Sequence, residues 1–422
     1  MTDRPGIARQ PRRPDWLSVD EAREIILSRV VELDRELVRL SAALGRVLAA
    51  DVESAVTHPA WDNSAMDGFA VLSRDVARAS RAKPVVLRVI DEIAAGTFPK
   101  RAVGPGEAIR VMTGAPVPTG ADGVTRVEHT EPGPEPGTIR VFDSSDAGRN
   151  IRRRGEDLKV GARPLNAGTL LRPAEIGVLA MLGQPSVPVY RQPRVGILAT
   201  GDELADFDEL EEVHAGRRIM NSNSYALAAQ VQEAGGQPVM LGIARDHPDS
   251  LRRRLESAIG KDALITSAGL AVGDHDYVKE VLDDLGLEFL FYRVLMRPGS
   301  PFTFGMLGSM PVFALPGNPV SAMVTFELMV RPALRKMTGL VHYDRPWRRV
   351  RLAEPVTTPG PRTHFYRATL ERQGEAWLAR LTGPQGSGIL TSMSEADALI
   401  RVPGGTNLQS GTEVDAIVLR EK

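Results

Sequence analysis

Four short polar segments hold most of the residues in this sequence that could do chemistry. Each directly follows a short apolar run and carries glycine, a carboxylate or both; they span residues 200–203, 245–246, 267–276 and 316–319. The carboxyl ends of parallel strands meet at one edge of an open α/β sheet, and ligands bind in the crevice beyond that edge. The sequence therefore predicts one polar crevice, built from all four segments.

The residue types in these segments suit a divalent cation beside a phosphorylated ligand. Carboxylate oxygens are the ligands that Mg²⁺ prefers, and they come from Glu203, Asp246, Asp274 and Asp276. Glycines let backbone N–H groups approach an anion closely, and a helix that begins after Asn318 would add its positive N-terminal end. The alternative is that these residues are turn glycines, helix caps and solvated acids. Neither a P-loop pattern nor a dinucleotide fingerprint is present.

Strand and helix patterns alternate along the part of the chain that must position these segments. Short apolar runs predict buried strands at 195–199, 239–243, 263–266 and 312–315. Helical patterns occupy 222–234, 248–259 and 276–285, and a last helix runs from 319 to about 336. This alternation predicts an α/β domain over 193–340, with a parallel sheet covered by helices on both faces.

Three further domains are expected around this α/β domain. A capping box at Ser18 and Glu21 begins the first helix of an elongated, discontinuous N-terminal domain, residues 17–50 and 150–192. A β-rich insert, residues 51–149, interrupts that domain. Alternating apolar and polar residues predict a small C-terminal β-barrel at 341–422.

Composition excludes several classes of function. The 422 residues include no cysteine, so disulfides, thiolate metal sites and a cysteine nucleophile are ruled out. Fifty-two Lys and Arg residues against 53 Asp and Glu residues leave a net charge of −1, without the footprint of a nucleic-acid binder. No apolar run approaches the ~20 residues of a membrane span, and residues 1–16 lack a secretory h-region. We therefore expect a soluble, cytoplasmic protein with no nucleic-acid or membrane partner.

Six segments together resemble the molybdopterin molybdenumtransferase family, which includes the bacterial MoeA proteins and the E domain of gephyrin. In chain order they are Asp62 to Ala70, Met112 to Pro118, Gly155 to Asp157, Thr200 to Leu204, Ser267 to Asp276 and Leu315 to Ser321. The first and last of these strings are long and specific, and the resemblance covers residues 17–420. It implies L-shaped homodimers with four domains per subunit, the third of which binds molybdopterin.

The resemblance also implies an activity and its residues. Such proteins use Mg²⁺ to insert molybdate into adenylylated molybdopterin, and they release AMP. The expected catalytic acids are Glu203, Asp157, Asp246 and Asp276; the expected metal ligands are Glu203, Asp246, Asp274 and Asp276. Asp62, Asp67 and Thr113 lie in the β-rich domain, which in the family faces the third domain of the other subunit. Further substrate-binding residues are Thr200, Ser267, Gly269, Gly273, Arg297, Ser300, Pro316, Gly317 and Asn318.

Several positions depart from the family pattern. Ala268 and Ala271 stand where the family usually has glycine and serine, and Arg297 and Ser300 stand where it usually has lysines. Ser300 removes a cation, and a lost charge-assisted hydrogen bond to an oxyanion would cost ~1.5–3 kcal/mol. Arg126 stands where the family usually shows a hydrophobic residue and is a candidate replacement. These departures keep two alternatives open: a non-catalytic paralogue that binds molybdopterin or a nucleotide as carrier or scaffold, and an enzyme for another phosphorylated substrate.

Overall fold

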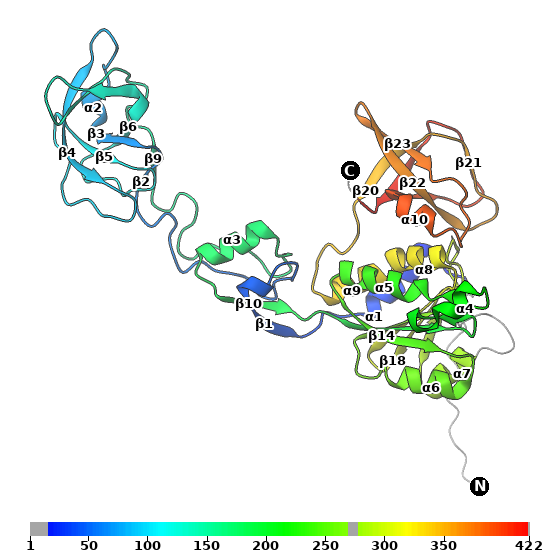
Figure 1. Cartoon of the computed structure of the whole chain (residues 1–422). Helices are drawn as coiled ribbons and strands as arrows, with labels where there is room; N and C mark the ends of the chain where they lie inside the picture. Colours follow the sequence, from blue (N-terminus) through cyan, green and yellow to red (C-terminus); the bar gives the residue numbers. More distant parts are fainter. Residues whose placement is uncertain (1–15, 269–276, 421–422) are drawn as a thin grey trace. The chain divides into compact units, whose positions relative to one another are not determined.

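The computed structural model describes residues 16–268 and 277–420, and the chain forms two compact units (Figure 1). The first unit comprises Met1–Ala50, Gly168–Pro173 and Ser186–Lys422; the second comprises Asp51–Ala167 and Ala174–Pro185. Each unit has its own buried apolar clusters, so each is described by itself. Among the described residues, no helix is long and apolar enough to cross a bilayer.

A six-stranded sheet forms the centre of the first unit. Its order is β14 (Gln237–Ala244), β11 (Arg194–Thr200), β15 (Ala263–Ser267), β19 (Met310–Leu315), β18 (Thr303–Leu307) and β16 (Glu288–Phe291). The four strands from β14 to β19 are parallel, as the sequence predicts. Strand β18 was not anticipated; it pairs antiparallel with β19 through a tight turn, so the complete sheet is mixed. The four candidate segments follow the four parallel strands.

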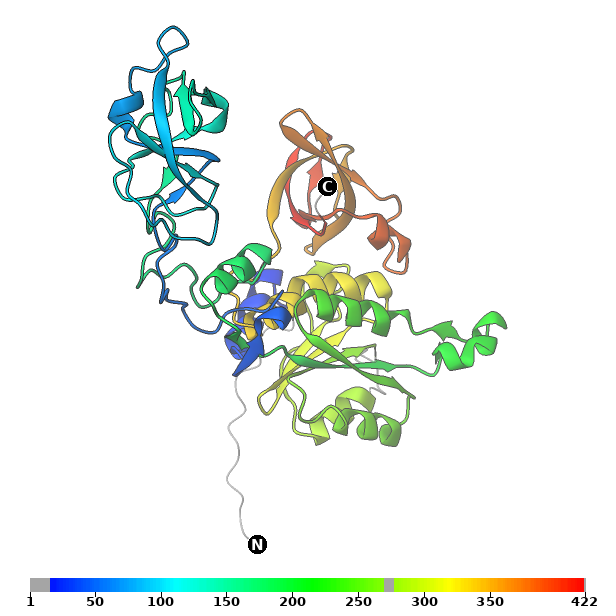
Figure 2. The same cartoon turned by 60° about the vertical axis from the view of Figure 1, so that its left-hand side comes forward.

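Helices cover both faces of this sheet (Figure 2). One face carries α1 (Val19–Arg29), α5 (Ser222–Glu233), α8 (Pro319–Thr325) and α9 (Arg331–Met337). The other face carries α6 (Pro248–Glu256) and α7 (Tyr277–Asp284). Alternate residues of β11 supply the two cores: Ile197 packs with the first group of helices and Leu198 with the second. This two-sided burial explains why the strand reads as a continuous apolar run.

Local signals place two of these helices. Ser18 caps α1 in the predicted capping box, in which its hydroxyl accepts from the Glu21 N–H and the Glu21 carboxylate accepts from the Ser18 N–H. Pro319 occupies the first turn of α8, where a missing N–H costs nothing. The predicted continuous helix from 319 to about 336 is interrupted by one π-helical turn, Phe326–Val330.

A closed β-barrel completes the first unit. Its strands are β22 (Thr363–Gln373), β23 (Ala376–Leu381), β20 (Trp347–Leu352), β26 (Glu413–Val418) and β24 (Ala398–Val402). Pairing of β22 with β24 closes the ring, as the predicted barrel requires. A sixth strand, β17 (Met296–Arg297), comes from the chain before the barrel and pairs parallel with the start of β22. The barrel sheet therefore includes residues of the preceding α/β segment.

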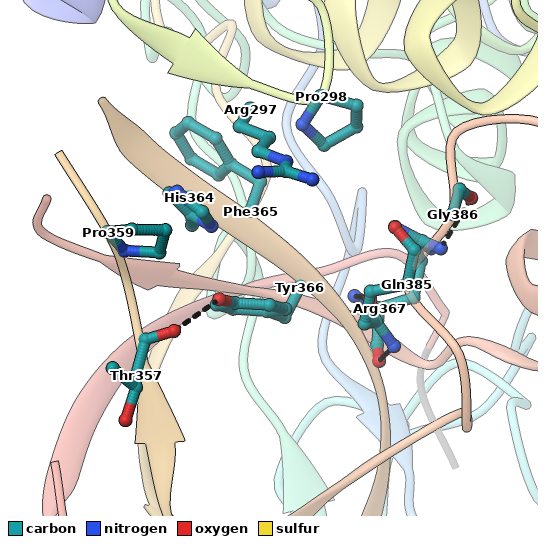
Figure 3. A pocket seen from close by; sticks show the side chains of 10 residues that line it. All are labelled: Arg297, Pro298, Thr357, Pro359, His364, Phe365, Tyr366, Arg367, Gln385 and Gly386. Atoms are coloured by element: carbon teal, nitrogen blue, oxygen red, sulfur yellow. Dashed lines mark hydrogen bonds between the residues drawn. The ribbon is translucent and has the colours of Figure 1, made fainter. Parts of the chain in front are cut away.

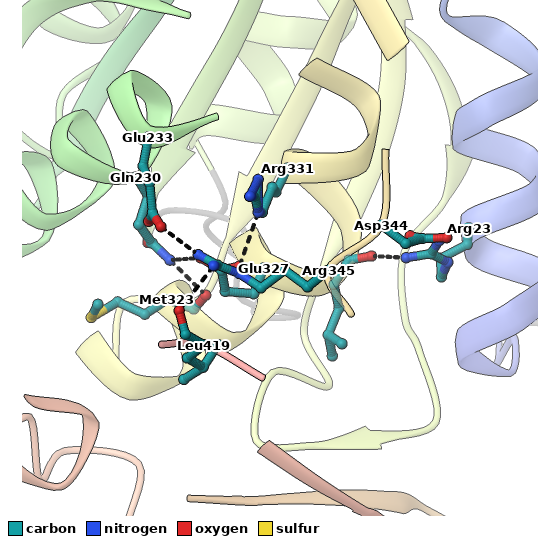
Figure 4. A network of polar contacts seen from close by, with 10 residues as sticks. Arg23, Gln230, Glu233, Met323, Glu327, Arg331, Asp344, Arg345 and Leu419 are labelled. Carbon is teal, nitrogen blue, oxygen red and sulfur yellow. Dashed lines mark hydrogen bonds and ion pairs between the residues drawn. The ribbon is translucent and has the colours of Figure 1, made fainter. Parts of the chain in front are cut away.

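A buried network of charges fastens the segment that leads into the barrel (Figure 4). Arg345 donates to Glu327 in the π-helical turn (2.6 Å), to Glu233 on α5 (2.9 Å) and to the Leu419 carbonyl (3.0 Å). Arg331 lies 3.5 Å from the same Glu327 carboxylate. Burial and the nearby Arg345 lower the pKa of Arg331 to about 10, which shows how crowded the cations are. Arg345 thus joins α5, the π-helical turn and the residue that follows the last barrel strand.

The first unit also contains a two-stranded ribbon of β1 (Arg35–Arg39) and β10 (Ser186–Tyr190). The second unit is β-rich, as expected, and holds α3 (Pro173–Met181) apart from its first residue. Its sheet has the order β6 (Gly123–Arg126), β3 (Gly68–Val71), β5 (Glu107–Val111), β4 (Val85–Ile93), β8 (Thr138–Val141) and β7 (Thr130–Pro132). A short pair, β2 (Asn63–Ser64) with β9 (Ile151–Arg152), brings the 62–67 and 151–157 segments together.

Candidate functional site

Three carboxylates gather beyond the ends of β11 and β14. Asp202 and Glu203 lie in the turn after β11, and Asp246 follows β14; the Asp246 N–H donates to Asp202 Oδ1 over 3.3 Å. Partial loss of hydration raises the pKa of Asp246, and the negative charges of Asp202 and Glu203 raise it further. The structure therefore brings the candidate residues Glu203 and Asp246 into one electrostatic cluster, and it adds Asp202.

Gly201 makes this turn possible. Its φ is +142°, a backbone conformation that L side chains rarely adopt. A Cβ atom at this position would lie 2.4 Å from Glu203 Oε2, because the Glu203 carboxylate folds back over the turn. The Glu203 carbonyl accepts from the Ile219 N–H (2.9 Å), which holds the other side of the residue. Replacement of Gly201 by any other residue would displace the carboxylate.

Asn223 joins two of the other candidate segments. Its side-chain amide donates to Ser267 Oγ at the end of β15 (2.8 Å) and to the Gly317 carbonyl after β19 (2.7 Å). Sequence reasoning missed Asn223, although its place in the first turn of a helix that follows a candidate strand was a usable signal. Thr200 is buried, and its hydroxyl has no partner within the described part of the chain.

The departure at residue 268 has a visible structural cost. Ala268 adopts a φ of +70°, in the left-handed region where glycine is favoured. Its N–H donates to the Leu315 carbonyl (3.1 Å), which keeps the turn against β19. A Cβ atom on Gly317 would lie 3.0 Å from the Ala268 methyl group. The methyl group at 268 thus leaves little room for a side chain at 317. Pro316 is buried beside it, and Asn318 is exposed.

Four candidate positions lie outside the described residues: Gly269, Gly273, Asp274 and Asp276. Ala271, the second departure in that segment, lies outside them too. Within the described ranges, no group of three or more His, Asp or Glu side chains is already arranged to hold a metal ion. Mg²⁺ commonly binds through one or two carboxylates together with water and substrate phosphates. Glu203 and Asp246 fit that kind of site, because their mutual repulsion falls when a cation lies between them.

A cavity of about 390 Å³ lies where β17 meets the barrel (Figure 3). Its lining residues are Arg297, Pro298, Thr357, Pro359, His364, Phe365, Tyr366, Arg367, Gln385 and Gly386. Arg367 is 1% exposed and donates to the carbonyls of Gln385 (3.3 Å) and Gly386 (3.0 Å) and to Ser392 Oγ (3.0 Å). None of these partners is a carboxylate. Burial lowers the pKa of Arg367, since nothing nearby neutralises its charge.

Arg297 adds a second positive charge to this cavity. Burial lowers the pKa of His364, and the charges of Arg297 and Arg362 lower it further, so His364 is held neutral. Burial raises the pKa of Tyr366, which keeps its hydroxyl protonated. The lining therefore holds the Arg297 guanidinium and no carboxylate. Arg367 adds a buried positive charge, although its N–H groups already bond to Ser392 and to backbone carbonyls. A positive lining without an acid suits an oxyanion. Sequence reasoning missed Arg367, because it reads as an ordinary residue of an alternating strand.

Ser300 does not line this cavity. Its hydroxyl donates to the Val294 carbonyl (3.1 Å), and the residue is 9% exposed. The serine therefore closes a turn of the backbone instead of facing a ligand, and a lysine at this position would need to displace that bond. Arg126, the candidate replacement cation, belongs to the second unit, where its Nε donates to Asp146 (3.1 Å). Its charge is thus already paired.

The remaining candidates lie in the second unit. Asp67 accepts from the Thr113 N–H and hydroxyl (2.7 Å each), and these bonds lower the pKa of Asp67. Asp62 accepts from the Arg154 N–H and from Arg153 Nη1 (2.7 Å each), with the same effect on the pKa of Asp62. Asp157 is exposed. Local hydrogen bonds thus fix Asp62 and Asp67 as ionised groups at turns of this unit.

Comparison with known proteins covers nearly the whole chain. Family models match residues 17–183 (MoeA N-terminal region, domains I and II), 196–336 (probable molybdopterin binding domain) and 349–419 (MoeA C-terminal region, domain IV). The chain is 37% identical over 426 residues to a molybdopterin molybdenumtransferase of Nostoc sp., covering 97% of each chain. It is 39% identical over 419 residues to that of Bacillus subtilis, covering 96% of this chain and 95% of the relative.

A solved structure shows the same architecture. The crystal structure of the molybdopterin biosynthesis moeA protein from Pyrococcus horikoshii OT3 aligns with a TM-score of 0.82 at 32% identity. The alignment covers 96% of this chain and all of that one. Sequence and fold therefore agree over the α/β domain, the β-rich unit and the barrel.

Proposed function

Because the chain belongs to the molybdopterin molybdenumtransferase family, we propose that it inserts molybdate into adenylylated molybdopterin with Mg²⁺ and releases AMP. The observation that carries this proposal is that the first unit contains both an acid cluster and an acid-free cationic cavity. The first suits a metal ion at a pyrophosphate, and the second suits a tetrahedral oxyanion.

In this proposal Glu203 and Asp246 would hold Mg²⁺, which would supply positive charge to the pyrophosphate of the substrate. When bound, the ion neutralises charge that builds up as AMP leaves. Gly201 allows the Glu203 carboxylate to reach the ion, and Asn223 fixes the Ser267 and Gly317 turns that border the same edge. The substrate's own dithiolene sulfurs capture molybdenum, which is compatible with a chain that has no cysteine.

Molybdate would bind in the cationic cavity. Arg297 would donate charge-assisted hydrogen bonds to its oxygens, and the buried charge of Arg367 would attract the dianion without a direct bond. The absence of a carboxylate from the lining matters here, because a dianion would be repelled by one. Ser300 takes no part in this site, so the two arginines must supply the charge that the family's lysines usually supply.

The test is AMP release by purified protein with adenylylated molybdopterin, molybdate and Mg²⁺. Glu203→Gln should lower the rate ~10²-fold or more, because it removes a carboxylate from a site that stabilises developing charge by several kcal/mol. Glu211→Gln, an exposed acid on the neighbouring helix, is the matched control and should keep the wild-type rate. Wild-type protein that releases no AMP would contradict the proposal.

A second candidate function is binding of molybdopterin as a carrier or scaffold. The positive φ of Ala268 favours it, since strain in this turn could weaken a productive pose. Tight pterin binding without turnover would support this alternative. We also expect the protein to act as a homodimer, as the family resemblance implies, and sedimentation of the full-length chain would test this.

A further inference from the structure

Arg245 makes an unusual set of contacts beside the acid cluster. It follows β14 and directly precedes Asp246, yet its side chain reaches across to the turn after β11. Its Nη1 atom lies 2.8 Å from the Leu204 carbonyl, 3.3 Å from the Asp202 carbonyl and 3.5 Å from the Gly201 carbonyl. One guanidinium nitrogen therefore faces three carbonyls of the turn that carries Glu203, those of Gly201, Asp202 and Leu204.

The other arm of the guanidinium is anchored separately. Its Nη2 atom donates to both carboxylate oxygens of Glu209, over 3.2 and 3.4 Å. Arg218 pairs with the same carboxylate, and the Arg245 N–H donates to Ser250 Oγ (3.2 Å). The side chain is thus held at both ends, and its plane is fixed relative to the turn.

The direction of these bonds decides what Arg245 can do. No ion pair joins Arg245 to Asp202, Glu203 or Asp246 within the described part of the chain; its one carboxylate partner is Glu209. It holds the backbone of the turn while the three carboxylates remain available to a cation. The guanidinium bonds to the turn through one nitrogen and to Glu209 through another, whereas lysine has a single nitrogen and cannot reach both sides in this way.

We propose that Arg245 is a positioning residue, which holds the 201–204 turn so that Glu203 faces Asp246 and the pair can bind a divalent cation. This inference rests on the proposed function, because it assigns the cation site to these two acids. The inference assigns Arg245 an indirect role, in which it contacts neither the substrate nor the ion. Without the fork, the Glu203 carboxylate would sample positions away from Asp246, and cation affinity would fall.

The experiment measures Mn²⁺ binding by electron paramagnetic resonance in the full-length protein, alone and with AMP. Arg245→Lys should raise the Kd for Mn²⁺ ~10-fold or more, the size seen when outer-shell partners of metal ligands are removed. The KM for molybdate should stay within about twofold, because the cationic cavity is built from other elements. Arg252→Lys, whose side chain pairs with Asp284 (2.7 Å) on the α6–α7 side, is the control and should bind Mn²⁺ like wild type.

Glu209→Gln provides a second variant. It frees the anchored arm of Arg245 without touching the turn, so it should raise the Kd for Mn²⁺ in the same direction and by less. If Arg245→Lys fails to fold, Glu209→Gln decides the question. Wild-type Mn²⁺ affinity in the folded variants would overturn the positioning role. Wild-type protein that binds Mn²⁺ but releases no AMP would instead contradict the proposed function and leave this test intact.

Discussion

Asp246 shows how a site residue can work against the stability of its own fold. Its carboxylate lies beside Asp202 and Glu203 and has lost part of its hydration. Both effects disfavour the charged form, and the raised pKa of Asp246 records this. Such clusters of repelling acids are common where a protein binds a cation, because the ion removes the repulsion when it binds.

This reasoning predicts a pH-dependent stability change in Asp246→Asn. Because the folded pKa is raised, the favourable contribution of protonated Asp246 is complete below its unfolded value near ~3.9 and is lost as pH rises through the folded value. The variant should therefore be more stable than wild type at pH 7, by ~0.2–1 kcal/mol, and the difference should vanish at low pH. Urea unfolding at several pH values checks this. Asp208→Asn, an exposed acid in the same region, should show no such trend.

Individual site residues differ in how far the sequence reveals them. The proximity of Glu203 and Asp246 could be predicted, because they follow buried strands directly and the carboxyl ends of parallel strands share an edge. Asn223 and Arg245 could not, since their roles depend on which distant carbonyls they reach. Arg367 is hidden for another reason: along β22 it alternates with the barrel-core residues Ala368 and Leu370, so the pattern places it on the outer face and does not reveal that it is buried.

Among the elements, the π-helical turn 326–330 carries the carboxylate at which several polar side chains of the first unit meet. It places Glu327 where Arg345, Arg331 and Gln230 converge, with the Glu327 side chain only 4% exposed. A regular helix through these residues would turn that carboxylate elsewhere. The sequence predicted a continuous helix because nothing in its apolar spacing marks an extra residue in one turn.

Removal of the central cation should therefore be costly. Arg345→Met should lower the free energy of unfolding by ~3 kcal/mol, the low end for a broken buried pair, because Arg331 still lies 3.5 Å from Glu327. Arg349→Met breaks an exposed pair with Asp415 (3.0 Å) on the barrel surface and should cost less than ~1 kcal/mol. Urea unfolding measures both losses. An equal loss of unfolding free energy in the two variants would show that the buried network stabilises the fold no more than an exposed ion pair does.

At the scale of the whole molecule, the chain forms two units with separate cores. The cationic cavity lies entirely within the first unit. We therefore expect calorimetry to resolve two unfolding transitions. Molybdate should raise the Tm of only one of them, that of the first unit. At a hundred times its Kd, molybdate should add ~2.7 kcal/mol to that unit, which corresponds to several degrees in Tm. The Arg345→Met substitution should lower the Tm of the same transition. A shift of both transitions together would contradict this prediction.

The fold class of the whole chain was within reach of the sequence, whereas its detailed topology was not. Strand–helix alternation and the capping box at Ser18 are local signals, so the parallel strands and α1 follow from them. The contribution of β17 to the barrel depends on pairing between segments that lie far apart in the sequence. Such pairing is decided by tertiary packing, which a single sequence records weakly.

The pairing of β17 with β22 sets a limit on how this protein can be cut or recombined. A barrel grafted from a relative would need a matching Met296–Arg297 strand, because that strand supplies both an edge partner and one of the two cavity arginines. A truncated chain that ends before the barrel would leave Arg297 on a strand without its β22 partner. Chimeras of this family should therefore be joined upstream of residue 296, so that donor and recipient never share the cavity.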